Sequence, residues 1–256
     1  VAPLAKRRLA AWVELCRRHH VQPLVADVVP IFKRGLDGEV TVNWSGYDEL
    51  IKPALAGAKK PPPIWLAPFR LDYPQADLYG GVTSSGYEKV ADAYLRNVGK
   101  HFTDNNWPRP VVWIHRDRPP RTTLPYGADH WRDWMTEARM RQSQTVGRIV
   151  RLTELDIGYL DPLPWTFDQS RRLPREGPVP AHVTMYAPLA QFLDPSVVAT
   201  LRQRQISTAV GPGDPPWRPS TALFANSGQI EALAYIAHRH DINTVWLGPA
   251  MTWPKQ

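Results

Sequence analysis

The chain has 256 residues, of which 43% are hydrophobic and 21% charged, an ordinary balance for a globular protein with a buried core. A single cysteine, Cys16, excludes an internal disulfide and a cysteine-rich zinc site, and no apolar run is long enough to span a membrane. The net charge of +7 is spread thinly, and no dense basic run is interleaved with aromatic residues, so we expect no nucleic-acid partner.

Helices and short apolar strands alternate along the chain. Apolar residues at helical spacing, together with capping residues, predict helices at 9–20, 47–55, 86–102, 130–144, 195–203 and from 227 onward. Short apolar runs predict strands at 23–29, 64–69, 111–114, 148–154, 182–186, 206–210 and 243–247, and a hairpin arm or short strand at 40–44. The segment 158–180, rich in proline and arginine, is predicted to be a long loop.

Strands separated by single helices are typical of a parallel α/β sheet, and their spacing is typical of a (β/α) barrel. The chain supplies seven such strands and opens on a helix, so an eight-stranded TIM-like barrel needs its first strand upstream of Val1. We therefore expect residues 1–256 to form one (β/α)8 barrel domain that lacks its first strand and is the greater part of a larger protein. An upstream domain or a partner chain would supply the rest. No sequence motif recurs from unit to unit.

Charged residues follow the strand at 111–114 without a break. They are His115, Arg116, Asp117 and Arg118. The carboxyl ends of strands carry the ligand-binding and catalytic groups of α/β sheets and barrels, so we expect the functional site at this end. An ordinary loop, in which Asp117 pairs with neighbouring arginines, explains the same pattern equally well.

Other strand exits supply further candidates. Arg70 follows the strand at 64–69, Tyr186 ends the strand at 182–186, and Glu154 and Asp156 are expected to leave the strand at 148–154. Late in the chain stand three tryptophans that would suit either a stacking floor for a sugar ring or ordinary packing: Trp217, Trp246 and Trp253.

Metal and cofactor sites are not indicated. The histidines at 19–20 and 238–240 lie at predicted helix ends, where an imidazolium suits the helix dipole, and no matching ligand spacing accompanies them. The chain contains neither a phosphate-binding glycine loop nor a serine-hydrolase elbow. We expect no metal and no cofactor.

Four landmarks follow one another along the chain: VTVNWSGYD at Val40–Asp48, HFTDNNW at His101–Trp107, Asp117-Arg118-Pro119 after a strand, and the closing Trp246 and Trp253. In this order they resemble the catalytic barrel of glycoside hydrolase family 123, whose members are β-N-acetylgalactosaminidases. The resemblance covers most of the chain. It implies a barrel fold, a glycan of the N-acetylhexosamine type as ligand, and a secreted or periplasmic location.

In that family the fourth strand ends in Asp-Glu-Pro. The Glu protonates the leaving oxygen, and the Asp steers the substrate's own acetamido group towards the anomeric carbon. The resemblance assigns the Asp to Asp117 and the Glu to Arg118, whose guanidinium stays protonated and cannot act as a general acid.

Two hypotheses therefore remain open. One is a substrate-assisted, retaining glycosidase that uses Asp117 and takes its acid from Glu154 or Asp156. The other is a catalytically inactive barrel that binds carbohydrate or serves as a scaffold, in which Arg70, Arg116 and Arg118 would favour acidic glycans.

Overall fold

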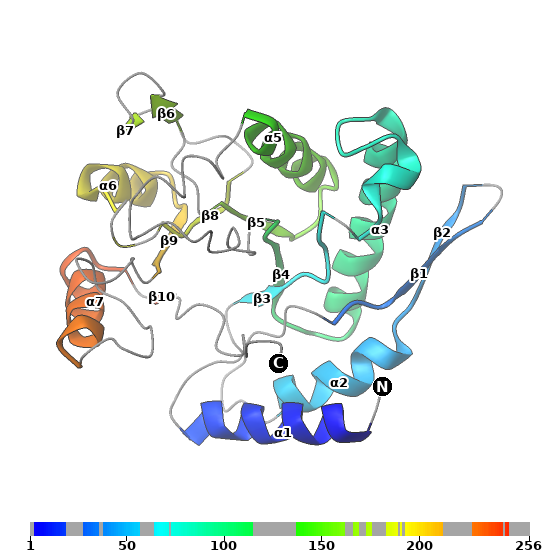
Figure 1. Cartoon of the computed structure of the whole chain (residues 1–256), viewed down its shortest axis with the longest axis horizontal. Coiled ribbons are helices and arrows are strands. Elements are labelled where there is room, and N and C mark those ends of the chain that lie inside the picture. Colours follow the sequence, from blue (N-terminus) through cyan, green and yellow to red (C-terminus); the bar gives the residue numbers. More distant parts are fainter. Residues whose placement is uncertain are drawn as a thin grey trace, which may run out of the picture. The chain divides into compact units, whose positions relative to one another are not determined.

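The structure is a computed structural model, and the parts of the chain that it describes are residues 3–18, 28–35, 38–56, 64–71, 73–114, 137–161, 166–168, 173–175, 183–188, 190, 193–211, 227–242 and 244–245. The chain divides into two compact units. The first unit comprises Val1–Asp117 and Glu137–Tyr159, and the second comprises Arg118–Thr136 and Leu160–Gln256. Figure 1 shows their elements in the colours of the sequence.

The first unit contains most of the long helices. Its elements are α1 Pro3–Arg18, β1 Ile31–Arg34, β2 Val40–Asn43, α2 Ser45–Ala56, β3 Ile64–Leu66, the 3-10 helix η1 Ala76–Tyr79, α3 Ser85–Asp104, β4 Arg109–Val112, α5 Glu137–Leu152 and the first part of β5 Gly158–Asp161. The second unit holds the end of β5 and then β6 Thr166–Asp168, β7 Leu173–Arg175, β8 Met185–Tyr186, α6 Pro195–Gln203, β9 Ser207–Val210, α7 Ser227–Arg239 and β10 Thr244–Val245.

The main sheet has six strands in the order β10-β9-β8-β5-β4-β3, and every neighbouring pair is parallel. Within the first unit β3 pairs with β4 and β4 with β5, and within the second unit the end of β5 pairs with β8, followed by β9 and β10. The predicted α/β class and parallel sheet are therefore confirmed. Two antiparallel pairs, β1–β2 and β6–β7, stand apart from this sheet.

Helix α3 carries the clearest pattern in the sequence and forms as predicted. Ser84 caps its first turn by accepting a hydrogen bond from the amide of Tyr87 at 3.1 Å. The apolar stripe of this helix is buried along its length: Tyr87, Val90, Ala91, Tyr94, Leu95, Val98 and Phe102. Helix α6 also begins as predicted, with Asp194 as its cap and Pro195 in its first turn.

Two predictions about elements are wrong. The segment 148–152, predicted as strand, continues helix α5, because Val146, Ile149, Val150 and Thr153 are buried at helical spacing. The predicted loop at 158–180 instead contains β5, β6 and β7. Residues 23–27 of the predicted strand at 23–29 lie outside the described residues, and Val28 and Val29, which are described, are not part of a strand.

A common turn ends four of the helices. The second residue after α3, α5, α6 and α7 has a left-handed backbone, with φ between 52° and 57° at Asn106, Glu154, Gln205 and Asp241. After three of these helices the next amide bonds to the carbonyl five residues earlier: Trp107 to Phe102 at 2.9 Å, Ile206 to Leu201 at 2.9 Å and Ile242 to Ala237 at 2.8 Å. This is the Schellman arrangement, in which apolar residues flank the turn. The left-handed turn thus recurs after α3, α5, α6 and α7, although no recurring sequence motif predicted it.

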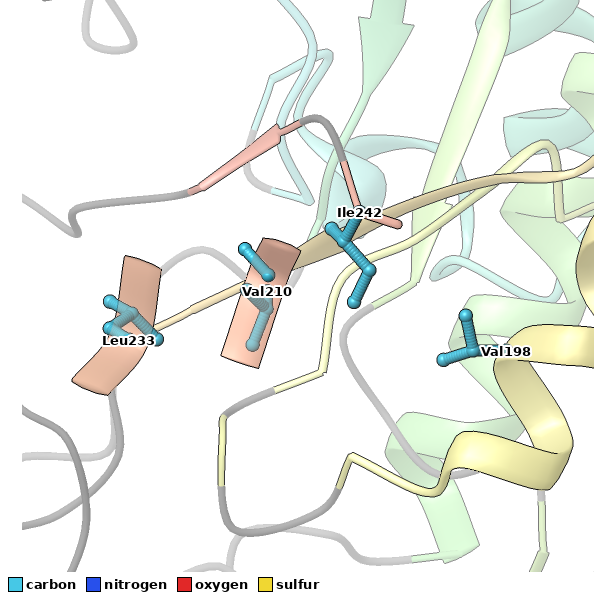
Figure 2. Close-up of a cluster of buried hydrophobic side chains, with 5 residues drawn as sticks. Val198, Val210, Leu233 and Ile242 are labelled. Carbon is cyan, nitrogen blue, oxygen red and sulfur yellow. The ribbon is translucent and has the colours of Figure 1, made fainter. Parts of the chain in front are cut away.

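The second unit has a core of its own. Figure 2 shows Val198 from α6, Val210 from β9, Leu233 from α7, and Ile242, which follows α7. Ala237 completes this cluster, so the two helices, strand β9 between them and the residue Ile242 after α7 share one apolar contact region. Among the helices that the structure describes, none is long and apolar enough to cross a membrane.

Candidate functional site

The carboxyl ends of β3 and β4 lie at the same edge of the first unit's sheet. The register pairs Leu66 with Val111, and the amide of Ala67 donates to the carbonyl of Val111 at 2.9 Å just past the end of β3. The chain then continues as Pro68–Leu71 after β3 and as Trp113–Ile114 after β4. This is the edge at which parallel sheets present their functional groups.

Arg70 lies in a tight turn at this edge. Its amide donates to the carbonyl of Tyr73 and its carbonyl accepts from the amide of Tyr73, both at 3.0 Å. The Tyr73 hydroxyl accepts a hydrogen bond from the amide of Phe32 at 2.8 Å and donates to the carbonyl of Pro30. Burial raises the pKa of Tyr73, so its hydroxyl stays protonated and can donate. The turn at Arg70 is thus tied to the start of β1.

Four aromatic rings, including that of Tyr73, pack together beside these hydrogen bonds. Tyr94 of α3 lies 5.6 Å from Phe32, 5.9 Å from Tyr73 and 6.3 Å from Phe69, measured between ring centroids. Its hydroxyl donates to the carbonyl of Pro68 at 2.7 Å. The hairpin, helix α3 and the loop after β3 therefore meet in one aromatic junction, formed by Phe32, Phe69, Tyr73 and Tyr94. Tyr73 therefore helps to hold the loop after β3 in place, and the sequence analysis did not identify it.

Glu154 and Asp156 do not lie at a strand exit. Both follow α5 and precede β5, so they are at the amino edge of the parallel sheet. Asp156 Oδ1 is 2.8 Å from Nε of Arg109, the first residue of β4, and Glu154 is exposed. The predicted position was wrong because residues 148–152 of the predicted strand are helical and the true strand begins at Gly158.

Tyr186 ends strand β8 as predicted, but it is only 3% exposed. The backbone register within the second unit pairs it with Asp161, the last residue of β5. Asp161 is therefore a carboxylate-bearing residue at a strand's carboxyl end that sequence reasoning missed. The signal was present in Tyr159 and Leu160, two apolar residues directly before an acid, but it lay in a segment predicted to be a loop.

The remaining predicted site residues lie outside the described residues, and their roles stay predictions: His115, Arg116, Asp117, Arg118, Trp217, Trp246 and Trp253. Among the side chains that the structure does describe, no three His, Cys, Asp or Glu residues are grouped to hold a metal ion.

Two of the landmark segments, Val40–Asp48 and His101–Trp107, meet in the first unit. The Trp44 ring stacks on the His101 imidazole, with centroids 4.0 Å apart and planes 4° from parallel. His101 Nε2 is 2.9 Å from Asp48 Oδ1, and the Trp107 ring meets His101 edge-on at 5.1 Å. We call Trp44, Asp48, His101 and Trp107 the landmark cluster. Trp107 precedes β4, so the cluster fixes the segment that leads into that strand.

Neither a protein-family model nor a curated protein matches this chain. Among solved structures, the chain is similar to the crystal structure of "a putative glycerophosphodiester phosphodiesterase from Galdieria sulphuraria", with 12% sequence identity and a TM-score of 0.28. The similarity covers 59% of this chain and 58% of that one, so the chain spans less than two thirds of that protein's length.

Proposed function

We propose that this chain is a glycoside-hydrolase-like barrel that binds N-acetylhexosamine glycans at the carboxyl ends of its parallel strands. In this proposal the six strands of the sheet belong to a (β/α)8 barrel.

The landmark cluster is the observation that carries this proposal. The resemblance to glycoside hydrolase family 123 rests on short segments scattered along the sequence, and two of these segments are in direct contact in the fold. Here Trp44 and Asp48 pack directly on His101, and the chain runs from Trp107 into β4. The contact supports the register that assigns the family's Asp to Asp117, five residues beyond the end of β4.

Asp117 would anchor the sugar by accepting a hydrogen bond from the N–H of the acetamido group. Arg118 holds the place of the general acid and cannot release a proton at working pH. Glu154 and Asp156, the substitutes expected from the sequence, lie at the amino edge of the sheet. Their position favours binding without hydrolysis, because loss of general acid catalysis costs a factor of roughly a hundred to ten thousand.

A second candidate function is an active glycosidase that takes its acid from elsewhere. The position of Asp161 at the carboxyl end of β5 favours it, because that edge is where catalytic carboxylates of such folds stand. In this version Asp161 would protonate the leaving oxygen in place of Arg118.

The test of the proposed function is the affinity for N-acetylgalactosamine and N-acetylglucosamine, measured by calorimetry on the wild type and on Asp117→Asn. We expect the substitution to weaken binding by roughly tenfold or more, because it removes a charged hydrogen-bond acceptor. Asp104→Asn, at the exposed end of α3, is the matched control and should bind as the wild type does. Equal affinity in wild type and Asp117→Asn would refute the role of Asp117.

A further inference from the structure

We propose that strand β2 pairs edge to edge with the β2 strand of a second copy of this chain, so that the two hairpins form one continuous sheet. The hairpin of β1 and β2 is a two-stranded sheet of its own (Figure 1). Such a hairpin has two edges, and a strand edge with unpaired backbone groups is a template for another strand. The proposal draws on contacts within the first unit alone and does not depend on the glycan site.

The hydrogen bonds at the turn show which backbone groups of the hairpin face outward. The Gly35 amide donates to the carbonyl of Glu39 at 2.8 Å, so this pair is bonded between the two strands. Bonded and non-bonded pairs alternate along an antiparallel ladder. The register therefore places the amides and carbonyls of Val40 and Val42 on the outer edge of β2, and those of Phe32 on the outer edge of β1.

The outer edge of β1 is closed. The Phe32 amide donates to the Tyr73 hydroxyl at 2.8 Å, and the same hydroxyl donates to the carbonyl of Pro30, which has no amide hydrogen of its own. Lys33 and Arg34 add positive charge to this strand, and charged side chains and proline are common means of protecting a sheet edge. A further strand therefore has no open place beside β1.

The outer edge of β2 has none of these features. Its residues, Val40–Asn43, are uncharged, include two valines and a threonine that favour strands, and contain no proline. Within the part of the chain that the structure describes, the outward amides and carbonyls of Val40 and Val42 make no hydrogen bond. Both residues are only partly buried. Strand β2 therefore offers unpaired hydrogen-bonding groups to a partner strand.

A second β2 strand matches this edge. When two copies run antiparallel with Thr41 opposite Thr41, Val40 of each copy lies opposite Val42 of the other, and each such pair can exchange both of its N–H···O bonds. The outward groups of both valines are then satisfied. The two threonines form a close non-bonded pair, which is a favourable pairing. No charges of like sign face each other in β2, whereas two β1 strands would bring positive side chains together.

The arrangement limits itself to two copies. Because the edge of β1 is closed, the joined sheet has no open edge for a third hairpin, and the product is a closed two-fold dimer instead of a fibre. Two strands of four residues bury much less than the roughly 1,200 Å² of a stable interface. We therefore expect weak association, at protein concentrations of roughly 100 μM and above.

The test measures association by sedimentation equilibrium in the wild type, Thr41→Lys, Thr41→Glu and an equimolar mixture of the two variants. Thr41 is exposed and lies on the face of the hairpin opposite to Phe32, whose ring packs on Tyr94 of α3. The substitutions therefore leave the contact between hairpin and helix in place. Thr200→Lys, at an exposed position of α6, is the matched control.

We expect the wild type to associate and each Thr41 variant alone to dissociate roughly tenfold more readily, because like charges then face each other at the two-fold axis. The mixture should recover the wild-type affinity, since opposite charges then meet. Thr200→Lys should match the wild type.

Hydrogen exchange on the wild type identifies the edge that takes part. The amides of Val40 and Val42 should exchange more slowly as the protein concentration rises, because only the dimer supplies them with acceptors. The amide of Thr41 belongs to a bonded pair inside the hairpin, so its exchange should change much less. This measurement does not depend on the folding of any variant.

Three results would overturn the proposal. The first is a wild type that stays monomeric up to roughly 1 mM. The second is association that persists undiminished in Thr41→Lys, or that is lost in both variants and not restored by mixing. The third is exchange at Val40 and Val42 that is independent of concentration. None of these measurements uses a glycan, so a failure here leaves the proposed function standing.

Discussion

Tyr47 and Tyr94 of the first unit have their hydroxyls in the protein interior. Burial raises the pKa of Tyr47 and of Tyr94 well above the ordinary value of a phenol. Tyr47 packs its ring against Trp44, and Tyr94 donates to Pro68. Both residues therefore stay neutral in the folded chain at a pH where an unfolded chain would ionise them.

This difference predicts a loss of stability in alkaline solution. A raised pKa in the folded state leaves the stability of the fold complete below about pH 10, the unfolded value, and lowers it as pH rises further. The free energy of unfolding should fall by up to about 1.4 kcal/mol per pH unit for each such tyrosine.

Urea unfolding between pH 8 and pH 11 measures this fall, and Tyr94→Phe should make the pH dependence less steep because it removes one ionising group. A free energy of unfolding that stays constant up to pH 11 in the wild type would contradict the predicted role of these two hydroxyls.

At the scale of single residues, the sequence predicted Arg70 as a site residue but did not predict its contact with Tyr73. Arg70 was predictable because it directly follows an apolar run, a pattern that involves only residues adjacent in the chain. Tyr73 could not be found in this way, because its hydroxyl partners Phe32 and Pro30 lie 41 and 43 residues earlier. Contacts across such separations are set by packing, which a single sequence does not display.

At the scale of elements, the turn that ends α3, α5, α6 and α7 carries a conformational cost. A left-handed backbone costs a residue with a Cβ atom roughly 1–2 kcal/mol, and glycine adopts it freely. None of the four positions holds glycine: they are Asn106, Glu154, Gln205 and Asp241. Each turn therefore carries a conformational cost that glycine would avoid, and the cost is smallest at Asn106 and Asp241, because Asn and Asp adopt this conformation more readily than other residues with a Cβ atom.

Replacing such a residue with glycine should stabilise the fold. For Gln205→Gly we expect the free energy of unfolding to rise by about 0.5–1 kcal/mol, since φ is 57° there and the side chain is exposed. Gln203→Gly, two residues earlier at the end of α6, is the control and should lower it by up to about 1 kcal/mol. Chemical denaturation measures both, and equal losses in the two variants would show that the turn stores no such cost.

The same scale shows where the sequence pattern misled. Helices α3 and α6 were predictable because a buried stripe or a capping pair, Asp194-Pro195, marks them locally. Two hydrogen bonds from Ser196, one from its hydroxyl at 2.7 Å and one from its amide at 2.8 Å, lower the pKa of Asp194, as expected for an N-cap carboxylate. In α5 the adjacent β-branched residues Ile149 and Val150 have a high strand propensity. Their burial at helical spacing outweighs that propensity, so the segment is a helix.

At the scale of the whole molecule, alternation of helices and strands was enough to predict the parallel sheet. Five of its six strands, all but β5, fall within or overlap predicted strands. Residues 148–152 are helical and the true strand, β5, begins at Gly158, which places Glu154 and Asp156 at the amino edge instead of the expected carboxyl edge. One helical segment predicted as strand therefore changed the proposed chemistry. A single domain over 1–256 stays a prediction, since the two units divide within β5.

The central claim is a glycan site in which Asp117 is kept and the general acid is replaced by Arg118. The most direct measurement is hydrolysis of chromogenic β-N-acetylgalactosaminide and β-N-acetylglucosaminide by the wild type, Arg118→Glu and Asp161→Asn. The account predicts no turnover by the wild type and turnover above background in Arg118→Glu. Wild-type turnover that Asp161→Asn abolishes would establish the second candidate function instead. Silence in all three, together with no binding of either sugar, would contradict the account.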